Sequence, residues 1–292
     1  MKTLSCLALL GLGGVGFGGW YCFGNLRPKN VKEYLEWSGL QLIKWEDKKS
    51  WDAVLEENKG WLGDVVGSSN DIEKIKQWCR DVLPKENYEQ YSKHSSLLCV
   101  DNLQTVKGKI IQKVGSLSGL IQNSNSEEAT KQYKVSFLFR KHIEGFKELI
   151  GYLTPPPERE GETPKENLGE AYVKLKSWCD SSLVAKPADD LVANVELFCS
   201  PKKFKTIKEL IDLNGEKMLT DSGNESQLKQ KYDEIKNLDT FKNDSDVTSK
   251  DSDQGLKTWC DQQKEKEFSS DGVFELYPKF RFRCVIVSEK QS

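Results

Sequence analysis

Short amphipathic runs that end in glycine occur three times along the chain. In each run apolar residues recur at every third or fourth position, which is the spacing of one helix face. Glycine follows, and glycine commonly ends a helix because it adopts the left-handed backbone conformation without steric cost. The runs are Val31–Gly39, Thr105–Gly115 and Thr206–Gly215. The pattern predicts three short opening helices, each closed by a glycine.

Two further helices are predicted after each opening helix. The first bears aromatic residues and covers residues 51–61, 133–139 and 228–238 in the three copies. The second ends in a Trp-Cys pair, and its sequence reads IKQWC, LKSWC and LKTWC. In the two clearest copies the apolar residues at helical spacing are Ile72, Ile75, Cys79 and Val82, and Leu168, Tyr172, Leu175 and Cys179. These Trp-Cys segments are the strongest helix predictions in the chain.

Capping residues suggest where two of the Trp-Cys helices begin. Asn70 followed by Glu73 fits a helix N-terminus. In Thr163-Pro164-Lys165-Glu166, Thr is suited to the N-cap, Pro to the first helical position and Glu to closing the capping box. We therefore expect these helices to start just after Asn70 and Thr163.

The repetition predicts a mainly α protein built from three small, α-rich modules with minor strand content. The modules are 28–100 (module 1), 101–200 (module 2) and 201–292 (module 3). Phe280–Val287 alternates between apolar and basic residues and then runs apolar, which predicts a strand at the end of module 3. Asp244–Asp253 is polar and charged, and we expect it to be mobile.

An uncharged segment, rich in Leu and Gly, precedes the modules at residues 4–23. Such a length just spans a hydrocarbon layer of about 30 Å, so residues 1–27 are predicted to hold a transmembrane anchor helix. A cleaved signal peptide is the alternative, with Leu4–Leu12 as its apolar region. Lipidation fits less well, because Tyr21 precedes Cys22 where a lipoprotein signal has a small residue.

Each module contains one pair of cysteines. The pairs are Cys79 with Cys99, Cys179 with Cys199, and Cys260 with Cys284. An even number of cysteines in a chain with an export segment favours disulfides, so we predict one bridge in each module. Reduced, buried cysteines are the alternative. The adjacent tryptophans, which we expect to shield the bridges from solvent, are Trp78, Trp178 and Trp259.

Composition points away from several classes of function. Charged residues make up 30% of the chain with a net charge of −2, and no basic stripe is present, so no nucleic-acid partner is expected. The sequence has no CxxC, HExxH or P-loop motif, and His94 and His142 are its two histidines. We predict no catalytic residue, no metal site and no cofactor. An exported hydrolase that relies on scattered carboxylates stays an alternative.

Four tryptophans lie close together in the sequence of module 1, at Trp37, Trp45, Trp51 and Trp61. Tryptophan is enriched at binding hot spots, which would allow a ligand-facing surface. Core packing is the favoured interpretation, because module 1 has no other large source of apolar area.

Leu7–Gly14, the Thr206–Leu210 start with its Gly215, and the Trp-Cys…Cys endings resemble large paralogous families of uncharacterised membrane-anchored proteins of hemotropic mycoplasmas. The family members are shorter, single-unit chains, and the three modules depart from that pattern. The resemblance implies a wall-less bacterium that lives on red blood cells. It also implies paralogues that are exposed at the surface or vary as antigens. It carries over no activity, cofactor or catalytic residue.

These features predict a single-pass cell-membrane protein with the bulk of the chain outside the cell, acting by binding or as a surface antigen. Its expected partners are the membrane, through the N-terminal segment, and a host-cell surface protein. A cytoplasm-facing, membrane-tethered scaffold is the alternative. It is favoured by Arg27, Lys29 and Lys32, which outnumber the positive charges before the apolar segment.

Overall fold

The computed structural model of the chain describes residues 27–156 and 166–286. These residues form 15 helices and two strands of two residues each, so the prediction of a mainly α fold is confirmed. The predicted anchor, residues 4–23, lies outside the described residues. In the part that is described, no helix combines the length and apolar character needed to cross a membrane.

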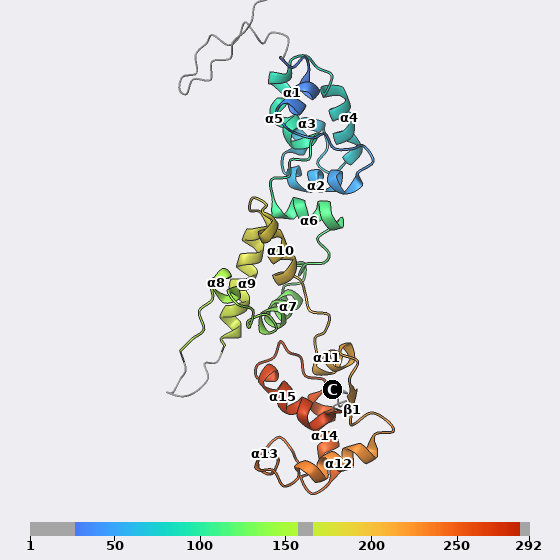
Figure 1. Cartoon of the computed structure of the whole chain (residues 1–292), viewed down its shortest axis with the longest axis vertical. Helices are drawn as coiled ribbons and strands as arrows, with labels where there is room; N and C mark the ends of the chain where they lie inside the picture. The colour runs from blue at the N-terminus through green and yellow to red at the C-terminus, as the bar shows by residue number, and fades with distance from the viewer. Residues whose placement is uncertain (1–26, 157–165, 287–292) are drawn as a thin grey trace, which may run out of the picture. The chain divides into compact units, whose positions relative to one another are not determined.

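The chain divides into two compact units, with the boundary between Leu103 and Gln104 (Figure 1). Unit 1 contains α1 (Val31–Trp37), α2 (Lys48–Asn58), α3 (Leu62–Val66), α4 (Ile72–Val82) and α5 (Tyr88–Leu98). Unit 2 contains α6 (Val106–Val114), α7 (Ser126–Leu138), α8 (Phe146–Leu149), α9 (Leu168–Leu183), α10 (Asp189–Phe198), α11 (Ile207–Leu213), β1 (Lys217–Met218), α12 (Glu225–Ile235), α13 (Asp239–Lys242), α14 (Asp253–Gln263), α15 (Val273–Cys284) and β2 (Val285–Ile286). Module 1 lies within unit 1, while module 3 and nearly all of module 2 lie within unit 2. The three-module boundaries themselves stay a prediction.

The opening helices α1, α6 and α11 are capped at both ends. Their N-cap side chains belong to Asn30, Thr105 and Thr206, and each accepts a hydrogen bond from a backbone N–H in the first turn. Thr206 and Glu209 form a complete capping box. The glycines that end the three runs, Gly39, Gly115 and Gly215, have φ values of 79°, 91° and 68°. Glycine is favoured at these positions because a side chain would strain this left-handed backbone conformation.

A backbone hydrogen bond ties the start of each opening helix to the turn after the Trp-Cys helix. The donors are the N–H groups of Val31, Val106 and Ile207, and the acceptors are the carbonyls of Lys85, Ala185 and Lys266, at 3.0, 3.0 and 3.2 Å. In every copy the acceptor follows the first cysteine by the same interval (79 to 85, 179 to 185, 260 to 266). The opening helix is therefore held against the Trp-Cys helix in the same way three times.

A second repeated hydrogen bond reaches the other cysteine of each pair. The N–H groups of Ile43, Ile121 and Leu219 donate to the carbonyls of Cys99, Cys199 and Cys284, at 3.1, 2.8 and 2.8 Å. In module 3 this contact continues into the antiparallel pair of β1 and β2, with Met218 opposite Val285. In module 1 the same hydrogen bond lies next to an isolated antiparallel β-bridge between Leu42 and Val100. The three modules thus share a common backbone frame around their cysteines.

The Trp-Cys segments form α4, α9 and α14, but two of the predicted starts are wrong. The cap of α4 is Asp71, whose side chain accepts the N–H of Glu73, and not the neighbouring Asn70. Helix α9 is capped by Asn167, whose side chain accepts the N–H of Glu170 at 3.1 Å. Glu166, the end of the predicted capping box, lies before the helix and pairs with Lys147 at 2.7 Å. The first three residues of that predicted box lie outside the described residues.

The strand predicted for Phe280–Val287 is also wrong over most of its length. Phe280 and Cys284 belong to α15, and only Val285 and Ile286 form a strand. Phe280 and Cys284 are one helical turn apart on the same face and both are fully buried. Packing of this face, together with the disulfide at Cys284, decides the conformation, so the local Phe-Arg alternation is a misleading signal.

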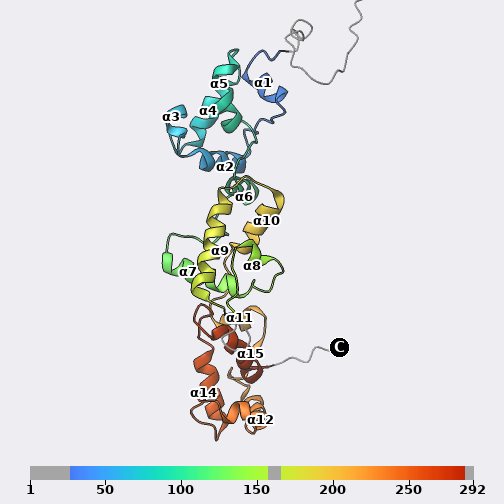
Figure 2. The same cartoon turned by 90° about the vertical axis from the view of Figure 1, so that its left-hand side faces the viewer.

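Modules 2 and 3 have separate cores that meet within unit 2. The core of module 2 gathers residues of α6, α7, α9 and α10, and α9 packs directly on α7 and α10 (Figure 2). The core of module 3 includes Val135 from α7, with Phe139 packed against it. The Phe139 ring lies edge-on to Phe204, Phe268 and Phe274, with ring centres 4.9–5.3 Å apart. This shared aromatic contact joins the two modules into one unit.

Candidate functional site

Three disulfides, Cys79–Cys99, Cys179–Cys199 and Cys260–Cys284, are formed in the structure, with Cα–Cα distances of 5.7–5.8 Å. The disulfide prediction is therefore confirmed. All six cysteines are buried. Each bridge joins the Trp-Cys helix to the end of the helix that follows it, which is α5, α10 or α15. In each module a buried disulfide therefore cross-links the two helices at whose C-terminal ends backbone carbonyls accept the repeated hydrogen bonds.

The three tryptophans beside the bridges differ in their burial. Trp259 is 1% exposed and belongs to the core of module 3. Trp78 and Trp178 are half-buried, and the Trp178 ring lies 6.0 Å from that of Phe198. Of the three tryptophans, only Trp259 is buried as we expected of a residue that shields its disulfide from solvent. Trp78 and Trp178 cover their disulfides less completely.

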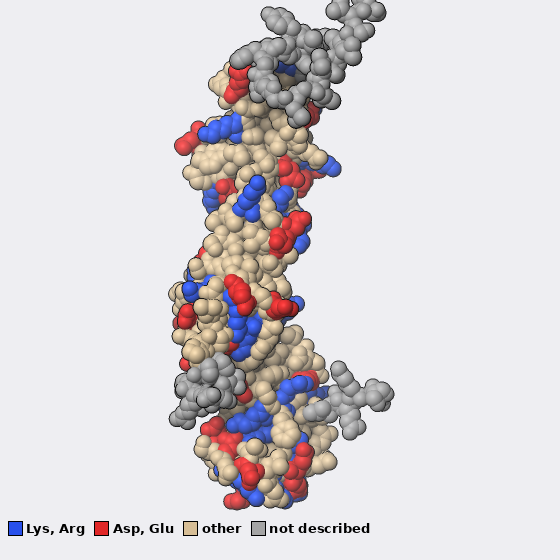
Figure 3. All heavy atoms as spheres, turned by 60° about the vertical axis from the view of Figure 1, so that its left-hand side comes forward, with Lys and Arg blue, Asp and Glu red and all other residues tan. Residues whose placement is uncertain are grey.

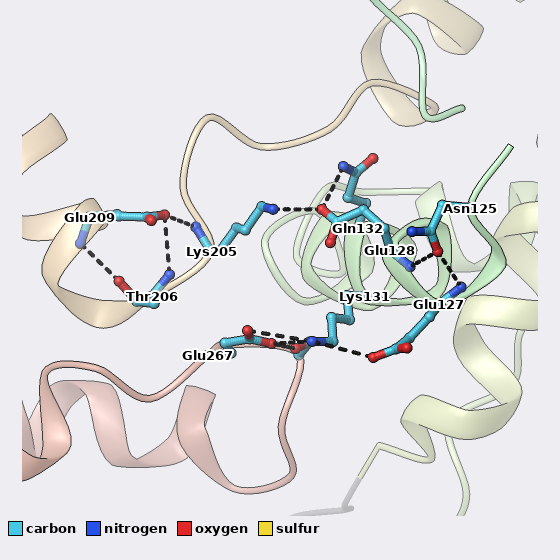
Figure 4. A network of polar contacts seen from close by, with 10 residues as sticks. Asn125, Glu127, Glu128, Lys131, Gln132, Lys205, Thr206, Glu209 and Glu267 are labelled. Carbon is cyan, nitrogen blue, oxygen red and sulfur yellow. Dashed lines mark hydrogen bonds and ion pairs between the residues drawn. The ribbon is translucent and has the colours of Figure 1, made fainter. Parts of the chain in front are cut away.

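A network of charged side chains joins modules 2 and 3 (Figure 4). Lys131 of α7 pairs with Glu267 of module 3 at 3.2 Å. Glu128 of α7 pairs with Lys205 of module 3 at 2.8 Å. The side chains enclose a space of about 30 Å³, which also touches Val135. A space of that size holds one or two water molecules and is too small for an organic substrate.

Electrostatics keep the acids of this network ionised. A hydrogen bond from the Lys205 ammonium lowers the pKa of Glu128. Hydrogen bonds from Ser269 and Lys131 lower the pKa of Glu267. A general acid or base works best when its pKa lies near the working pH, and these shifts go the other way. The network is therefore suited to holding two modules together by ion pairing.

Arg283, at the end of α15, is buried inside module 3 at 2% exposure. Its guanidinium donates to Asp244 at 2.6 Å and to the carbonyl of Thr240. The rings of Trp259 and Phe241 lie 5.0 and 5.2 Å from it, close enough for cation–π attraction. The positive charge is thus compensated by a carboxylate and by two aromatic faces.

Asp244 completes this site, although its segment was predicted to be mobile. Its side chain is 6% exposed and also pairs with Lys279 at 3.0 Å. Burial by itself would raise the pKa of Asp244, but hydrogen bonds from Lys279 and Arg283 outweigh it, and the pKa is lowered. The expectation of mobility is not met at Asp244, because local polarity does not reveal a partner 39 residues away.

Arg140, just after α7, is the second buried arginine of unit 2, at 4% exposure. Its guanidinium donates to the Ser136 hydroxyl, and to the carbonyl and hydroxyl of Ser200 at 3.1 and 2.9 Å. Among the described residues, no carboxylate lies within 4.0 Å of it. Burial lowers the pKa of Arg140 to about 10. Sequence reasoning missed both arginines, because nothing local distinguishes them from exposed basic residues.

In unit 1 the tryptophans divide between core and surface. Trp51 is fully buried, and its indole N–H donates to the carbonyl of Lys44 at 3.0 Å. Trp45 stacks on Trp51 with ring centres 5.6 Å apart, and Trp61 lies 5.4 Å from His94. Core packing is therefore the role of Trp51, while Trp45 and Trp61 cover the edge of the core.

Trp37 is the exception, because 71% of it is exposed. Its ring lies 6.5 Å from Tyr34, which in turn stacks on Tyr88 at 4.8 Å. Arg27 donates to the Tyr88 hydroxyl at 2.9 Å. We call Tyr34, Trp37 and Tyr88 the aromatic face of unit 1.

No constellation of metal ligands is brought together by the folding of residues 27–156 and 166–286. His94 is half-buried against Trp61, and His142 is exposed beside the ring of Phe274. No family model matches the chain, and no curated protein or solved structure is significantly similar to it. The fold and the site are therefore interpreted from their own geometry.

Proposed function

We propose that the chain is a membrane-anchored repeat protein whose modules face outward and act by binding a partner or as an exposed antigen. Buried cystines in three successive modules are the observation that carries this proposal. Disulfides persist in oxidising compartments and are rare in the reducing cytosol. A lone apolar segment before such modules is typical of an exported chain.

The surface of the modules suits contact with an aqueous exterior. Basic and acidic side chains are interspersed over the face shown in Figure 3, without an extended patch of one sign. Such a surface favours solubility and gives no electrostatic footprint for nucleic acid. The ion-paired junction of modules 2 and 3 has too little space for an organic substrate. This junction is therefore not where we expect a partner to bind, and we look for the contact surface among the exposed side chains.

The aromatic face of unit 1 is the best candidate for the contact surface. Trp, Tyr and Arg are the residues most enriched at binding hot spots. Trp37 presents a large apolar ring, while Tyr34 and Tyr88 hold each other in a fixed stack. A stacked pair loses little side-chain entropy when a partner binds, which favours affinity.

Cellular location can be tested through the cystines. Non-reducing peptide mapping of the protein taken from cells should find the three native pairs and no free thiol at Cys79, Cys179 or Cys260. Protease treatment of intact cells should remove the modules while leaving a cytosolic marker intact. Free thiols together with protection from protease would instead support the cytoplasm-facing scaffold.

Binding can be tested separately on the full chain in detergent, with host-cell surface proteins as the bait. Trp37→Ala should weaken capture by about 30-fold, the effect of losing a hot spot of about 2 kcal/mol. Phe282→Ala is the matched control, since Phe282 is an exposed aromatic residue of unit 2. Equal loss in both variants, or capture that disappears in high salt for the wild type, would contradict a specific contact through Trp37.

A further inference from the structure

The loop that follows the opening helix is longer in module 2 than in modules 1 and 3. In each module it runs from the left-handed glycine to the residue whose N–H donates to the second cysteine of the pair. These ends are Gly39 and Ile43, Gly115 and Ile121, and Gly215 and Leu219. The interval is four residues in modules 1 and 3 and six in module 2 (39 to 43, 215 to 219, 115 to 121). Module 2 therefore departs from the shared backbone frame at this loop.

The longer loop forms one wall of a pocket of about 370 Å³ that lies within unit 2. Helix α6 and one residue of α10 supply the rest of the lining. Apolar contacts are offered by Ile110, Val114 and Leu120, and polar ones by Ser116, Ser118 and Glu196. A volume near the lower end of the range for organic-ligand sites, with an apolar lining and a few polar groups, suits one small molecule.

Hydrogen bonds within the loop hold this wall in place. The side-chain amide of Gln122 donates to the carbonyls of Leu117 and Leu120, both at 2.7 Å. The Leu120 N–H donates to the Leu117 carbonyl at 2.9 Å. The hydroxyls of Ser116 and Ser118 lie 2.8 Å apart and share one hydrogen bond. Because the wall is already ordered, a ligand binds without the entropic cost of fixing a free loop.

The charge of the pocket favours a neutral ligand. Glu196 is its charged lining residue, and Glu196 Oε2 pairs with the Lys113 ammonium at 2.6 Å. A cationic ligand would have to compete with Lys113, and an anionic one would be repelled by Glu196. A purely apolar ligand would take water from two hydroxyls and a carboxylate without replacing its hydrogen bonds. The pocket is therefore suited to a neutral molecule that carries several hydroxyl groups.

We propose that this pocket binds a single neutral pyranose sugar, either free or at the end of a glycan. A pyranose ring has an apolar C–H face, which lies against Ile110, Val114 and Leu120, and a rim of hydroxyls. These hydroxyls bond to the two serines and to the Glu196 carboxylate, which has acceptor sites besides the one that Lys113 uses. Val114 is 53% exposed, so the pocket is open on its side and a glycan can continue outward.

The test is saturation-transfer difference NMR on the full chain in a detergent without a sugar headgroup. Methyl glycosides of glucose, galactose and mannose are the probes, and at least one should give a saturable difference signal. Cyclohexanol has a ring of similar size with a single hydroxyl and should bind much more weakly. Displacement of the bound glycoside by a glycopeptide ending in the same sugar assigns the site to glycan ends. Lack of displacement assigns it to the free sugar.

Replacing the polar lining groups should weaken binding of the methyl glycoside. The double variant Ser116→Ala, Ser118→Ala should raise its dissociation constant by about 10-fold, and Glu196→Ala by about 10–100-fold. Ser226→Ala and Glu234→Ala are the matched controls. Ser226 is an exposed serine of unit 2, and Glu234 is an acid ion-paired on a helix surface, with Lys231 at 2.9 Å. Neither control should change the dissociation constant.

This site is independent of the aromatic face of unit 1, so Trp37→Ala should leave glycoside binding unchanged. Circular dichroism of each variant checks that its helices are formed. The sugar site would be overturned by the absence of a difference signal from all three glycosides. An equal signal from cyclohexanol, or binding that survives in both pocket variants, would overturn it as well.

Discussion

Modules 2 and 3 each bury one arginine, and the two arginines have different surroundings. Arg283 pairs with Asp244 and lies between two aromatic rings. Arg140 is equally enclosed but reaches only serine and backbone oxygens. Since both modules share the same cystine-centred backbone frame, the frame does not determine how a buried charge is compensated. In module 3 a side chain of the same module supplies the counter-charge, whereas in module 2 serine and backbone oxygens hold the guanidinium without one.

The largest effect is expected from removing the counter-charge of Arg283. Asp244→Ala leaves a cation buried without a carboxylate, which typically costs about 3–5 kcal/mol. Denaturant-dependent hydrogen exchange of α14 and α15 in the full chain measures the loss. Asp246→Asn, an exposed acid two residues away, should change stability by less than about 0.5 kcal/mol. A small loss for Asp244→Ala would show that the two arginines are less different than their contacts indicate.

The cystines test whether modules 2 and 3 are otherwise equivalent. Their sequence separations are 20 and 24 residues, so chain entropy predicts nearly equal stabilisation of about 3 kcal/mol each. Replacing both cysteines of one pair by alanine should therefore destabilise either module by a similar amount in the same exchange experiment. A much larger loss in one module would mean that its bridge also holds the buried arginine in place.

Replacing each arginine by methionine compares the two charges directly. Arg283→Met leaves Asp244 with Lys279 and the backbone N–H of Asp246 as its partners, and a loss of about 2–3 kcal/mol is expected. Arg140→Met removes an uncompensated charge and keeps an apolar side chain of similar length. Its cost should stay below about 1 kcal/mol, or the variant should be more stable than wild type. Equal losses in urea unfolding of the two variants would contradict the difference proposed here.

The smallest effect is the acid response of module 3. Because the folded-state pKa of Asp244 lies below the ordinary aspartate value of about 3.9, its contribution is complete above that value. The contribution is lost as the pH falls through the folded-state pKa and Asp244 becomes protonated. Urea unfolding between pH 5 and pH 2 should therefore show a steeper decline for the wild type than for Asp244→Asn. Parallel curves would show that the Asp244 pair does not stabilise the folded state.

Local signals predicted the repeated elements well. The glycine-terminated runs form α1, α6 and α11, and the Trp-Cys segments form α4, α9 and α14. Helical spacing and glycine caps act over a few residues, so they can be read from one segment at a time. The two caps were misplaced because several polar residues compete near each start. Only the final backbone path decides which of them reaches the free N–H groups.

Longer-range features could not be predicted in this way. The alternating sequence at the end of module 3 is typical of a strand, yet packing of Phe280 and Cys284 makes it a helix. Four tryptophans in module 1 look alike in the sequence, while their exposure ranges from fully buried Trp51 to largely exposed Trp37. Burial depends on which side of an element faces the core, and that is set by other elements.

The sequence by itself therefore determined the opening helices and the Trp-Cys helices, their repetition and the pairing of the cysteines. Each of these depends on local periodicity or on a spacing that recurs along one chain. Tertiary structure alone decided which charges are buried and which partners they have. Asp244 meets Arg283, and Arg140 meets Ser200 instead of an acid, because packing brings distant segments together. The cost of a buried charge depends on everything that surrounds it, which a single segment does not contain.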